Sequence, residues 1–408
     1  MSARRAPSLA FLVGTLLAAQ TLGTVATMML PAAAPKVAET YGFSASLIGY
    51  QISLLAAFML VALTLGSHLS ARWGACRVTQ IALALLAAGC LAAILPHAAF
   101  VFGSAIAFGL GYGLLAPPAS QLLARFAPPA SRNLVFSVKQ TGVPLGGILA
   151  AAVTPVIAVR FGWQWALAGD ALALCALIAL LQRARAGWDD DRDPAARLAV
   201  KPLAGIALIW KQPALRLLSI SGGCFVIVQV CLQTFTVVLF VEQLDIGLIL
   251  AGAVLTASQV GGVFGRLFWG WLADVTRNCF SVLTVLAGVM LASCLLVLAV
   301  TPGWPLAAAC ALFFVLGSTA SGWNGAFLAE VARLTPSREI PLATGGSLFY
   351  VNVGKMIGPI AFTSAYFWLD SYSLVFGLLA LPAVVGLASV FGAHHVGERA
   401  GLKPAAEG

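Results

Sequence analysis

The chain has 408 residues and a net charge of +9, yet only 9% of its residues are charged and 61% are hydrophobic. Soluble domains carry about 25% charged residues, so this composition excludes a water-soluble globular protein and indicates a chain that crosses a membrane several times. A basic chain can also indicate nucleic-acid binding. Here the excess of Lys and Arg is better explained by the cytoplasmic loops of a membrane protein, and we expect no nucleic-acid partner.

Apolar runs divide the chain into twelve predicted membrane spans. The first run, from Leu9 to Leu30, is similar to a secretory signal peptide, but it is long enough to cross a bilayer and we interpret it as a span. Each run is close to the roughly 20 residues that a spanning helix needs. The spans are predicted at residues 8–30, 46–69, 78–96, 100–125, 134–159, 164–183, 215–241, 247–272, 279–300, 306–332, 341–368 and 373–393.

Basic residues are distributed unequally between the two sides of these spans. With a cytoplasmic N-terminus, 19 of the 23 Lys and Arg residues lie in inner loops or at inner helix ends, and only Lys36 and Arg160 lie outside. The remaining two, Lys139 and Lys355, lie within spans. Basic residues collect in cytoplasmic loops, so both termini are predicted to be cytoplasmic. We place the chain in the inner membrane of a bacterium.

The longest polar segment, from Arg183 to Arg216, divides the spans into two groups of six. We predict an all-α membrane protein with two pseudo-symmetric six-helix bundles, residues 1–183 and 215–393, a cytoplasmic linker at 184–214 and a cytoplasmic tail at 394–408. Lys201 to Trp210, in the linker, is either a helix on the membrane surface or a solvated segment. Residues recur in the two halves at nearly constant offsets, as expected of a repeat: Gly49 with Gly252, Leu69 with Leu272, Gly109 with Gly317 and Gly146 with Gly354.

The stretch from Gly261 to Arg277 carries the most specific pattern in the chain. Gly261 and Gly265 are four residues apart, a spacing that lets two membrane helices approach closely. The segment that follows, Gly270-Trp-Leu-Ala-Asp274 and then Arg277, resembles the loop motif of the major facilitator superfamily of secondary transporters. The resemblance implies alternating access, with a substrate site between two bundles near the middle of the membrane.

A first-half copy of this motif reads Leu69-Ser-Ala-Arg72-Trp-Gly74-Ala-Cys-Arg77. It keeps the glycine and the basic residues, but Ala71 stands where the family usually has its acid. The resemblance therefore implies a gating role for Asp274 and Arg277 in the second half and for Arg72 and Arg77 in the first.

The sequence carries no enzyme or cofactor signature. Gly354-Lys355 is similar to the end of a phosphate-binding loop, but Phe349 and Met356 stand where that motif needs Gly and then Ser or Thr. The chain contains no His-Glu-x-x-His zinc motif. We expect no enzyme, no cofactor and no metal ion.

Two lysines lie inside predicted spans, where a charge is costly unless it faces water or a partner. Lys355 follows Pro341 by fourteen residues, roughly 20 Å along a helix, which places it near the middle of the membrane. We interpret Lys355 as a binding group for an anion; the alternative is a pair with a backbone carbonyl or a buried acid. Lys139 lies nearer the inner end of its span, where it either contacts substrate or extends to the cytoplasm.

Arg266 has two interpretations: it pairs with Asp274 at the cytoplasmic gate, or it contacts the substrate. An arginine in the eighth span, four residues before Gly270, together with Lys355 in the eleventh, resembles the oxalate/formate and monocarboxylate branches of the superfamily. The resemblance implies that these cations face an organic anion.

Uncharged polar side chains indicate candidate cavity faces, although each could instead hydrogen-bond two helices together. No acid lies in the first, fourth or seventh span, where proton-driven drug and sugar carriers of the family usually have one. The candidate substrate-binding residues are Lys355, Arg266, Lys139, Gln20, Tyr112, Gln140, Gln233, Trp323, Asn324, Tyr350 and Asn352.

These features predict a secondary active transporter for a small organic anion, with a carboxylate as the preferred class and proton coupling left open. The alternative is proton-coupled efflux of a hydrophobic or cationic drug. A membrane sensor or enzyme is disfavoured because no catalytic constellation or soluble domain is visible. The expected partners are the small-molecule substrate, the lipid bilayer and a coupling proton, and we expect a monomer.

Overall fold

The structure is a computed structural model that describes residues 8–128, 132–195, 203–336 and 339–399. Contacts divide the chain into two compact units, Met1–Val200 and Lys201–Gly408. Every regular element in the described ranges is helical. A helix satisfies its backbone N–H and C=O groups internally, as an apolar chain in a bilayer must because no water is available to bind these groups.

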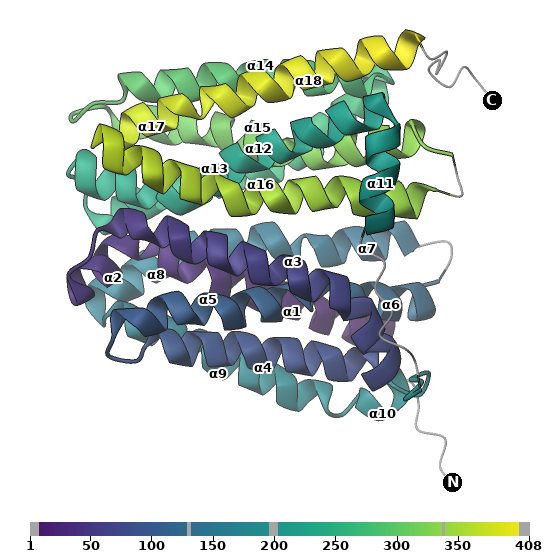
Figure 1. Cartoon of the computed structure of the whole chain (residues 1–408). Helices are drawn as coiled ribbons and strands as arrows, with labels where there is room; N and C mark the ends of the chain where they lie inside the picture. The colour runs from purple at the N-terminus through teal and green to yellow at the C-terminus, as the bar shows by residue number, and fades with distance from the viewer. Residues whose placement is uncertain (1–7, 129–131, 196–202, 337–338, 400–408) are drawn as a thin grey trace. The chain divides into compact units, whose positions relative to one another are not determined.

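The first unit contains six membrane-spanning segments and two short helices near their ends (Figure 1). Its elements are α1 (Leu9–Ala32), α2 (Ala34–Tyr41), η1 (Ala45–Leu47), α3 (Ile48–Trp73), α4 (Ala75–Ala93), α5 (Ala98–Gly113), α6 (Ala116–Phe126), α7 (Arg132–Gln140), α8 (Gly142–Arg160), α9 (Trp163–Leu181) and α10 (Arg185–Trp188). Within the unit α5 packs against α3 and α4, α1 packs against α8, and α4 also packs against α9.

Prolines interrupt two spans of the first unit. The span Ala98–Phe126 divides into α5 and α6 just before Pro117 and Pro118, which have no N–H to bond to the preceding turn. The span Val135–Arg160 divides into α7 and α8 at Thr141, shortly before Pro144. Both breaks lie within a few residues of polar side chains discussed below, Tyr112 and Lys139.

The second unit contains five more spans of this kind and the long helix α16. Its elements are α11 (Leu203–Lys211), α12 (Pro213–Val238), the π-helical turn η3 (Leu239–Gln243), α13 (Leu248–Thr276), α14 (Cys279–Leu296), η4 (Val297–Ala299), α15 (Leu306–Arg333), α16 (Ile340–Leu369), α17 (Tyr372–Leu378) and α18 (Ala380–Arg399). α13 packs along α15, and α12 packs against α16 and α18. The prediction of twelve spans is confirmed: the tenth, for example, was expected at 306–332 and is Leu306–Arg333.

The span α16 differs in composition from the others. Eleven helices of the described chain are long and apolar enough to cross a membrane, and α16 is not among them although it has 30 residues. Asn352 and Lys355 lower its mean hydropathy at the centre of the helix. Because α16 packs against α12 along its length in the same way as the apolar spans, it completes the twelve. Polar side chains within a membrane span are costly unless they have a partner or contact water.

Close contact between α13 and α15 depends on glycine. A Cβ placed at Gly261 would overlap the backbone of Phe314, and a Cβ at Gly265 would overlap the backbone of Ser318. On the facing helix α15, a Cβ at Gly317 would overlap the backbone of Ser258 on α13. The predicted close approach of a helix at Gly261 and Gly265 is confirmed, because small residues let two backbones come into contact.

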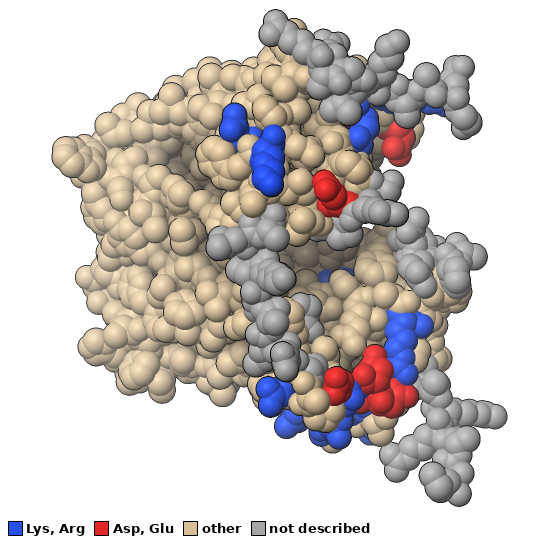
Figure 2. All heavy atoms as spheres, turned by 45° about the vertical axis from the view of Figure 1, so that its right-hand side comes forward, with Lys and Arg blue, Asp and Glu red and all other residues tan. Residues whose placement is uncertain are grey.

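The outer surface of the helices is largely apolar. In Figure 2 the charged side chains of the visible face gather in small groups and most of the surface is tan. Large apolar side chains are strongly exposed in the described structure, among them Leu267 at 71% and Trp368 at 89%. A soluble protein rarely exposes apolar surface on this scale, so these side chains are expected to face lipid.

The predicted linker is divided between the two units. Its first part contains α10 and an acidic segment in the first unit. Its last part contains α11 in the second unit, which overlaps the Lys201 to Trp210 helix considered from the sequence. α11 packs against α16, where Gly205 and Gly346 bring the two backbones into contact. α11 is therefore part of the second bundle rather than a solvated segment.

Candidate functional site

A buried lysine lies at the end of α7 in the first unit. Lys139 is 5% exposed, and its ammonium donates to Gln20 Oε1 at 2.6 Å and to Gln140 Oε1 at 3.2 Å. The Gln20 amide in turn donates to the Tyr112 hydroxyl at 3.1 Å. The four candidate residues of this unit are thus brought together from α1, α5 and α7. Lys139 does not extend to the cytoplasm, which was one of the two expectations for it.

Glycines of α8 hold α1 close to this cluster. A Cβ at Gly142 would lie 2.8 Å from Gln20 Cβ, and one at Gly146 would lie 2.6 Å from Thr24 Cβ. Thr24 accepts or donates a hydrogen bond with the Tyr112 hydroxyl at 3.2 Å. These two glycines therefore allow α1 to lie close to α8. The close packing places Gln20 within hydrogen-bond distance of Lys139, near the break between α7 and α8.

Lys355 lies in the middle of α16 in the second unit. Its neighbours Gly354 and Gly358 pack against α12, with a Cβ at Gly358 only 3.3 Å from Ile227. The side chain is partly buried, and no residue in the described part of the chain accepts a hydrogen bond from its ammonium or pairs with it. The guanidinium of Arg266 lies close enough to act electrostatically on Lys355. Two cations of the second unit thus lie in the same region.

Arg266 contacts α15 rather than Asp274, which lies eight residues further along α13. Its Nε donates to the Ser321 carbonyl at 3.4 Å. Asp274 is exposed and forms no ion pair with any residue that the structure describes. The Arg266–Asp274 pair considered from the sequence is therefore not formed in this structure. Arg277 is also exposed and ends α13 with a left-handed φ of 51°.

Three other candidates of the second unit hydrogen-bond neighbouring helix groups. Asn352 donates to the Leu348 carbonyl at 2.8 Å, while its own buried Oδ1 has no partner in the described structure. Asn324 donates to the Ser321 carbonyl at 3.3 Å. Gln233 donates to Gln259 Oε1 at 3.4 Å. The unsatisfied Asn352 oxygen, one turn from Lys355, is a polar group available to a ligand.

Two aromatic candidates have different surroundings. Trp323 is fully buried, its ring packs between Phe225 and Phe327, and its N–H donates to the Ala320 carbonyl at 2.9 Å. Its contacts are those of a packed core residue, and we leave it out of the proposed site. Tyr350, by contrast, is only partly buried on α16.

Asp189 has a role that was not predicted from the sequence. This linker acid is buried and accepts the backbone N–H of Cys76 at 2.7 Å and of Arg77 at 3.1 Å, at the start of α4. Burial raises the pKa of the Asp189 carboxyl, and the two N–H groups and the Arg185 guanidinium oppose that shift. Gly74 makes room for it, since a Cβ there would lie 2.6 Å from Asp189 Cβ. A linker acid therefore binds the first-half motif loop, which has Ala71 in place of its own acid.

The rest of the acidic segment binds neighbouring helix ends. Arg125 on α6 pairs with Asp190 at 2.6 Å and Asp191 at 3.3 Å. The backbone N–H of Asp193 donates to the Ala71 carbonyl at 2.8 Å, at the end of α3. The run of aspartates is visible in the sequence, but by itself it predicts only a polar segment. Its partners could not be identified from the sequence because they lie more than fifty residues away along the chain.

Comparisons with known proteins agree with this architecture. Residues 16–359 match the family model described as Major Facilitator Superfamily. The chain therefore belongs to this superfamily of membrane transporters.

Two relatives and one solved structure show how far the similarity extends. The chain is 27% identical over 347 residues to monocarboxylate transporter 11 of Mus musculus, covering 80% of this chain and 74% of that protein. It is 28% identical over 383 residues to a probable nitrate/nitrite transporter of Mycobacterium tuberculosis, covering 89% and 91%. The crystal structure of a bacterial homologue of the human lysosomal transporter Spinster has a TM-score of 0.78 at 14% identity, covering 96% and 99%; this similarity concerns the fold.

Proposed function

We propose that this transporter carries a small organic anion, with carboxylates as the preferred class. The observation that carries the proposal is the ammonium of Lys355, which lies mid-helix in α16 with no counter-ion in the described chain. A cation inside a membrane protein is costly unless water or an anion solvates it. An anion that arrives beside Lys355 supplies the missing charge, in a medium that screens less than bulk water.

The surroundings of Lys355 favour an anion over a cation as the substrate. Arg266 adds a second positive charge to the same region. In the first unit, Lys139 is bound by the amide oxygens of Gln20 and Gln140, which are neutral and leave its charge uncompensated. Each unit thus contains a cation within a membrane span, and a positive charge beside either of these cations would be repelled.

The remaining candidates supply polar contacts in this proposal. Asn352 and Tyr350 lie on the same helix as Lys355, and Gln233 and Asn324 lie on α12 and α15. The names of the relatives also support an anion, since monocarboxylates, nitrate and nitrite are all anions. We propose the inner membrane of a bacterium and a monomeric carrier as its setting.

Proton symport is the coupling that we propose. A monovalent anion entering a cell moves against an inside-negative potential at about 2.3 kcal/mol per 100 mV. One accompanying proton makes the transport step electrically neutral and removes this cost. Uptake should therefore rise with an inward proton gradient, and uptake that ignores the gradient contradicts symport.

The test of the anion proposal is a comparison of Lys355→Met with the parent in proteoliposomes. Labelled mono- and dicarboxylates are the probes, and a lipophilic cation is the comparison. Loss of one charge-assisted contact costs about 1.5–3 kcal/mol, so affinity by calorimetry should fall roughly tenfold or more. Lys355→Arg should recover binding in part, because a planar fork replaces a compact charge.

Lys211→Met is the matched control, since it removes an exposed lysine at the end of α11 in the same unit. It should bind and transport the anion like the parent. If Lys355→Met also binds and transports the anion like the parent, the anion proposal loses its support. Transport of the lipophilic cation would then favour drug efflux as the function.

Asp274 and Arg277 are proposed to act at the cytoplasmic gate, together with Arg72 and Arg77 of the first-half loop. This rests on the motif resemblance and on the exposure of Asp274 without an ion pair in the described chain, which leaves it available for a partner in another conformation. Asp274→Asn should slow transport several-fold while equilibrium binding of the substrate stays at the parental value. An unchanged turnover rate would remove Asp274 from the gate.

A further inference from the structure

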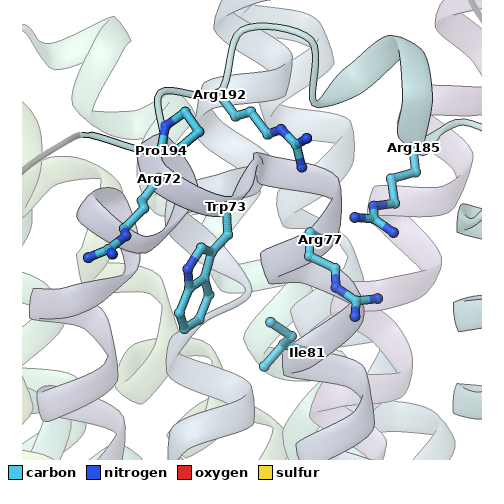
Figure 3. A pocket seen from close by; sticks show the side chains of 7 residues that line it. All are labelled: Arg72, Trp73, Arg77, Ile81, Arg185, Arg192 and Pro194. Atoms are coloured by element: carbon cyan, nitrogen blue, oxygen red, sulfur yellow. The ribbon is translucent and has the colours of Figure 1, made fainter.

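Four arginines and one tryptophan line a cavity of about 540 Å³ in the first unit (Figure 3). The cavity lies where α3 ends and α4 begins, and the segment after α9 closes its other side. In Figure 3, Arg77, Arg185 and Arg192 lie on one side of the Trp73 ring and Arg72 lies on the other. The lining residues are Arg72, Trp73, Arg77, Ile81, Arg185, Arg192 and Pro194.

The positive charges of this cavity are not neutralised by nearby acids. The side chains of Arg72, Arg77 and Arg192 form no ion pair with any residue in the described ranges. Arg185 has only a long contact with Asp189, at 3.7 Å. Asp189 itself is engaged by the N–H groups at the start of α4. Four like charges around one space repel one another, and the repulsion is relieved when an anion enters.

The acidic segment from Asp189 to Asp193 is held in place by contacts with neighbouring helices. Asp190 and Asp191 are bound by Arg125, and the N–H of Asp193 is bound by Ala71. Arg192 lines the cavity, and none of these aspartates is among the residues that line it. The chain therefore uses its acids to attach the linker and leaves the arginines facing the cavity.

We propose that this cavity binds a phosphate-bearing anion, either the headgroup of an anionic phospholipid or a soluble phosphate. Guanidinium groups match phosphate oxygens as two-pronged donors. Basic pockets between membrane helices on the cytoplasmic side bind such headgroups. Trp73 is 43% exposed, and an indole of this kind is suited to the boundary between lipid and water. This site gives Arg72 and Arg77 a role separate from the proposed gate.

The experiment compares the parent with the double variant Arg77→Gln/Arg192→Gln. The purified full chain in detergent is titrated with dioleoylphosphatidylglycerol, with a zwitterionic phosphatidylethanolamine and with inorganic phosphate, and bound molecules are counted by native mass spectrometry. Each basic side chain near a phosphate raises the binding affinity by a factor on the order of five to ten. The double variant should therefore bind its anionic ligand at least about tenfold more weakly.

The double variant Arg160→Gln/Arg183→Gln is the matched control, because it removes two exposed arginines of the same unit that lie outside this cavity. It should bind like the parent. Arg77 and Arg192 form no ion pair in the described chain, so the thermal midpoint without ligand should be unchanged, and the single variant Arg192→Gln serves if the double variant does not fold.

Two results support the site and identify its ligand. Arginine-dependent binding of phosphatidylglycerol that inorganic phosphate does not displace assigns it to a lipid headgroup. Arginine-dependent binding of inorganic phosphate that displaces the lipid assigns it to a soluble phosphate. If the parent and the cavity variant bind every probe equally, or if phosphatidylethanolamine binds as tightly as phosphatidylglycerol, the proposal is overturned.

Discussion

The two lysines within membrane spans differ in whether the protein itself supplies hydrogen-bond partners for the ammonium group. Lys139 has two amide oxygens within hydrogen-bond distance, so its ammonium is solvated by the protein itself. Lys355 has no such partner in the described chain, and its neighbours Gly354 and Gly358 are used for packing against α12. The sequence shows both as lysines in apolar spans, but only Lys355 is left to be solvated by water or a ligand.

Asp189 contributes to stability through partners that are distant in the sequence. Its carboxylate accepts two N–H groups at the start of α4, as a capping side chain does. Its burial carries a desolvation cost that offsets part of the gain. Asp190, by comparison, pairs with Arg125 while 56% of its own side chain is exposed, and such surface pairs contribute little.

We expect Asp189→Ala to destabilise the first unit by about 1–2 kcal/mol, the usual cost of losing a helix cap. Asp190→Ala should change stability by less than about 0.5 kcal/mol. The measurement is the thermal midpoint of the detergent-solubilised protein, followed by size-exclusion chromatography of heated samples. Equal midpoints for the two variants would show that the Asp189 contacts do not stabilise the loop between α3 and α4.

At the scale of elements, the closest packing in the second unit occurs where small residues replace larger side chains. α13 and α15 approach at Gly261, Gly265 and Gly317, each with the backbone of the facing helix where its Cβ would be. Membrane helices gain little from the hydrophobic effect when they associate, so close van der Waals contact has to supply the attraction. The glycines therefore determine how near the two helices lie.

Gly265→Ala should separate α13 from α15, because the added methyl group meets the backbone of Ser318 and a backbone cannot move aside as a flexible side chain can. Overpacking of this kind costs about 1–3 kcal/mol. Gly288→Ala on α14 is the control, since no atom lies within 4 Å of its added Cβ. The control should leave the thermal midpoint unchanged or raise it, because alanine favours a helix more than glycine does. A Gly265→Ala midpoint equal to that of the control would refute the packing argument.

At the scale of the whole molecule, topology follows from the distribution of basic residues. Of 23 Lys and Arg residues, the predicted orientation leaves only Lys36 and Arg160 on the outside. Lys36 pairs with Glu39 within α2, and Arg160 ends α8. An even number of spans then puts both termini on the same side of the membrane.

A reporter fused after Gly408 that is active only in the cytoplasm should therefore be active. A second reporter, active only outside the inner membrane, should be active when it is inserted after Gly162 between α8 and α9 and silent after Gly408. The opposite pattern would reverse the orientation and would place the proposed phosphate cavity on the outer side.

The sequence alone determined the membrane class, the twelve spans, the two groups of six and the motif loop around Asp274. Eleven of the spans follow from local composition, since a run of about 20 apolar residues is long enough to cross a bilayer as a helix. It also identified Lys355 as a charge in an apolar span, because that observation needs only the residue and its neighbours along the chain.

Only the tertiary structure decided which of these residues have partners. Lys139 meets Gln20 across 119 positions of sequence, and Asp189 meets Cys76 across 113. Trp323, a substrate candidate by sequence, is instead packed between Phe225 and Phe327. Hydropathy specifies that a helix crosses the membrane but not its rotation about its own axis. That rotation, set by glycine contacts with neighbouring helices, decides which side chains bind one another, which pack, and which remain free for a ligand.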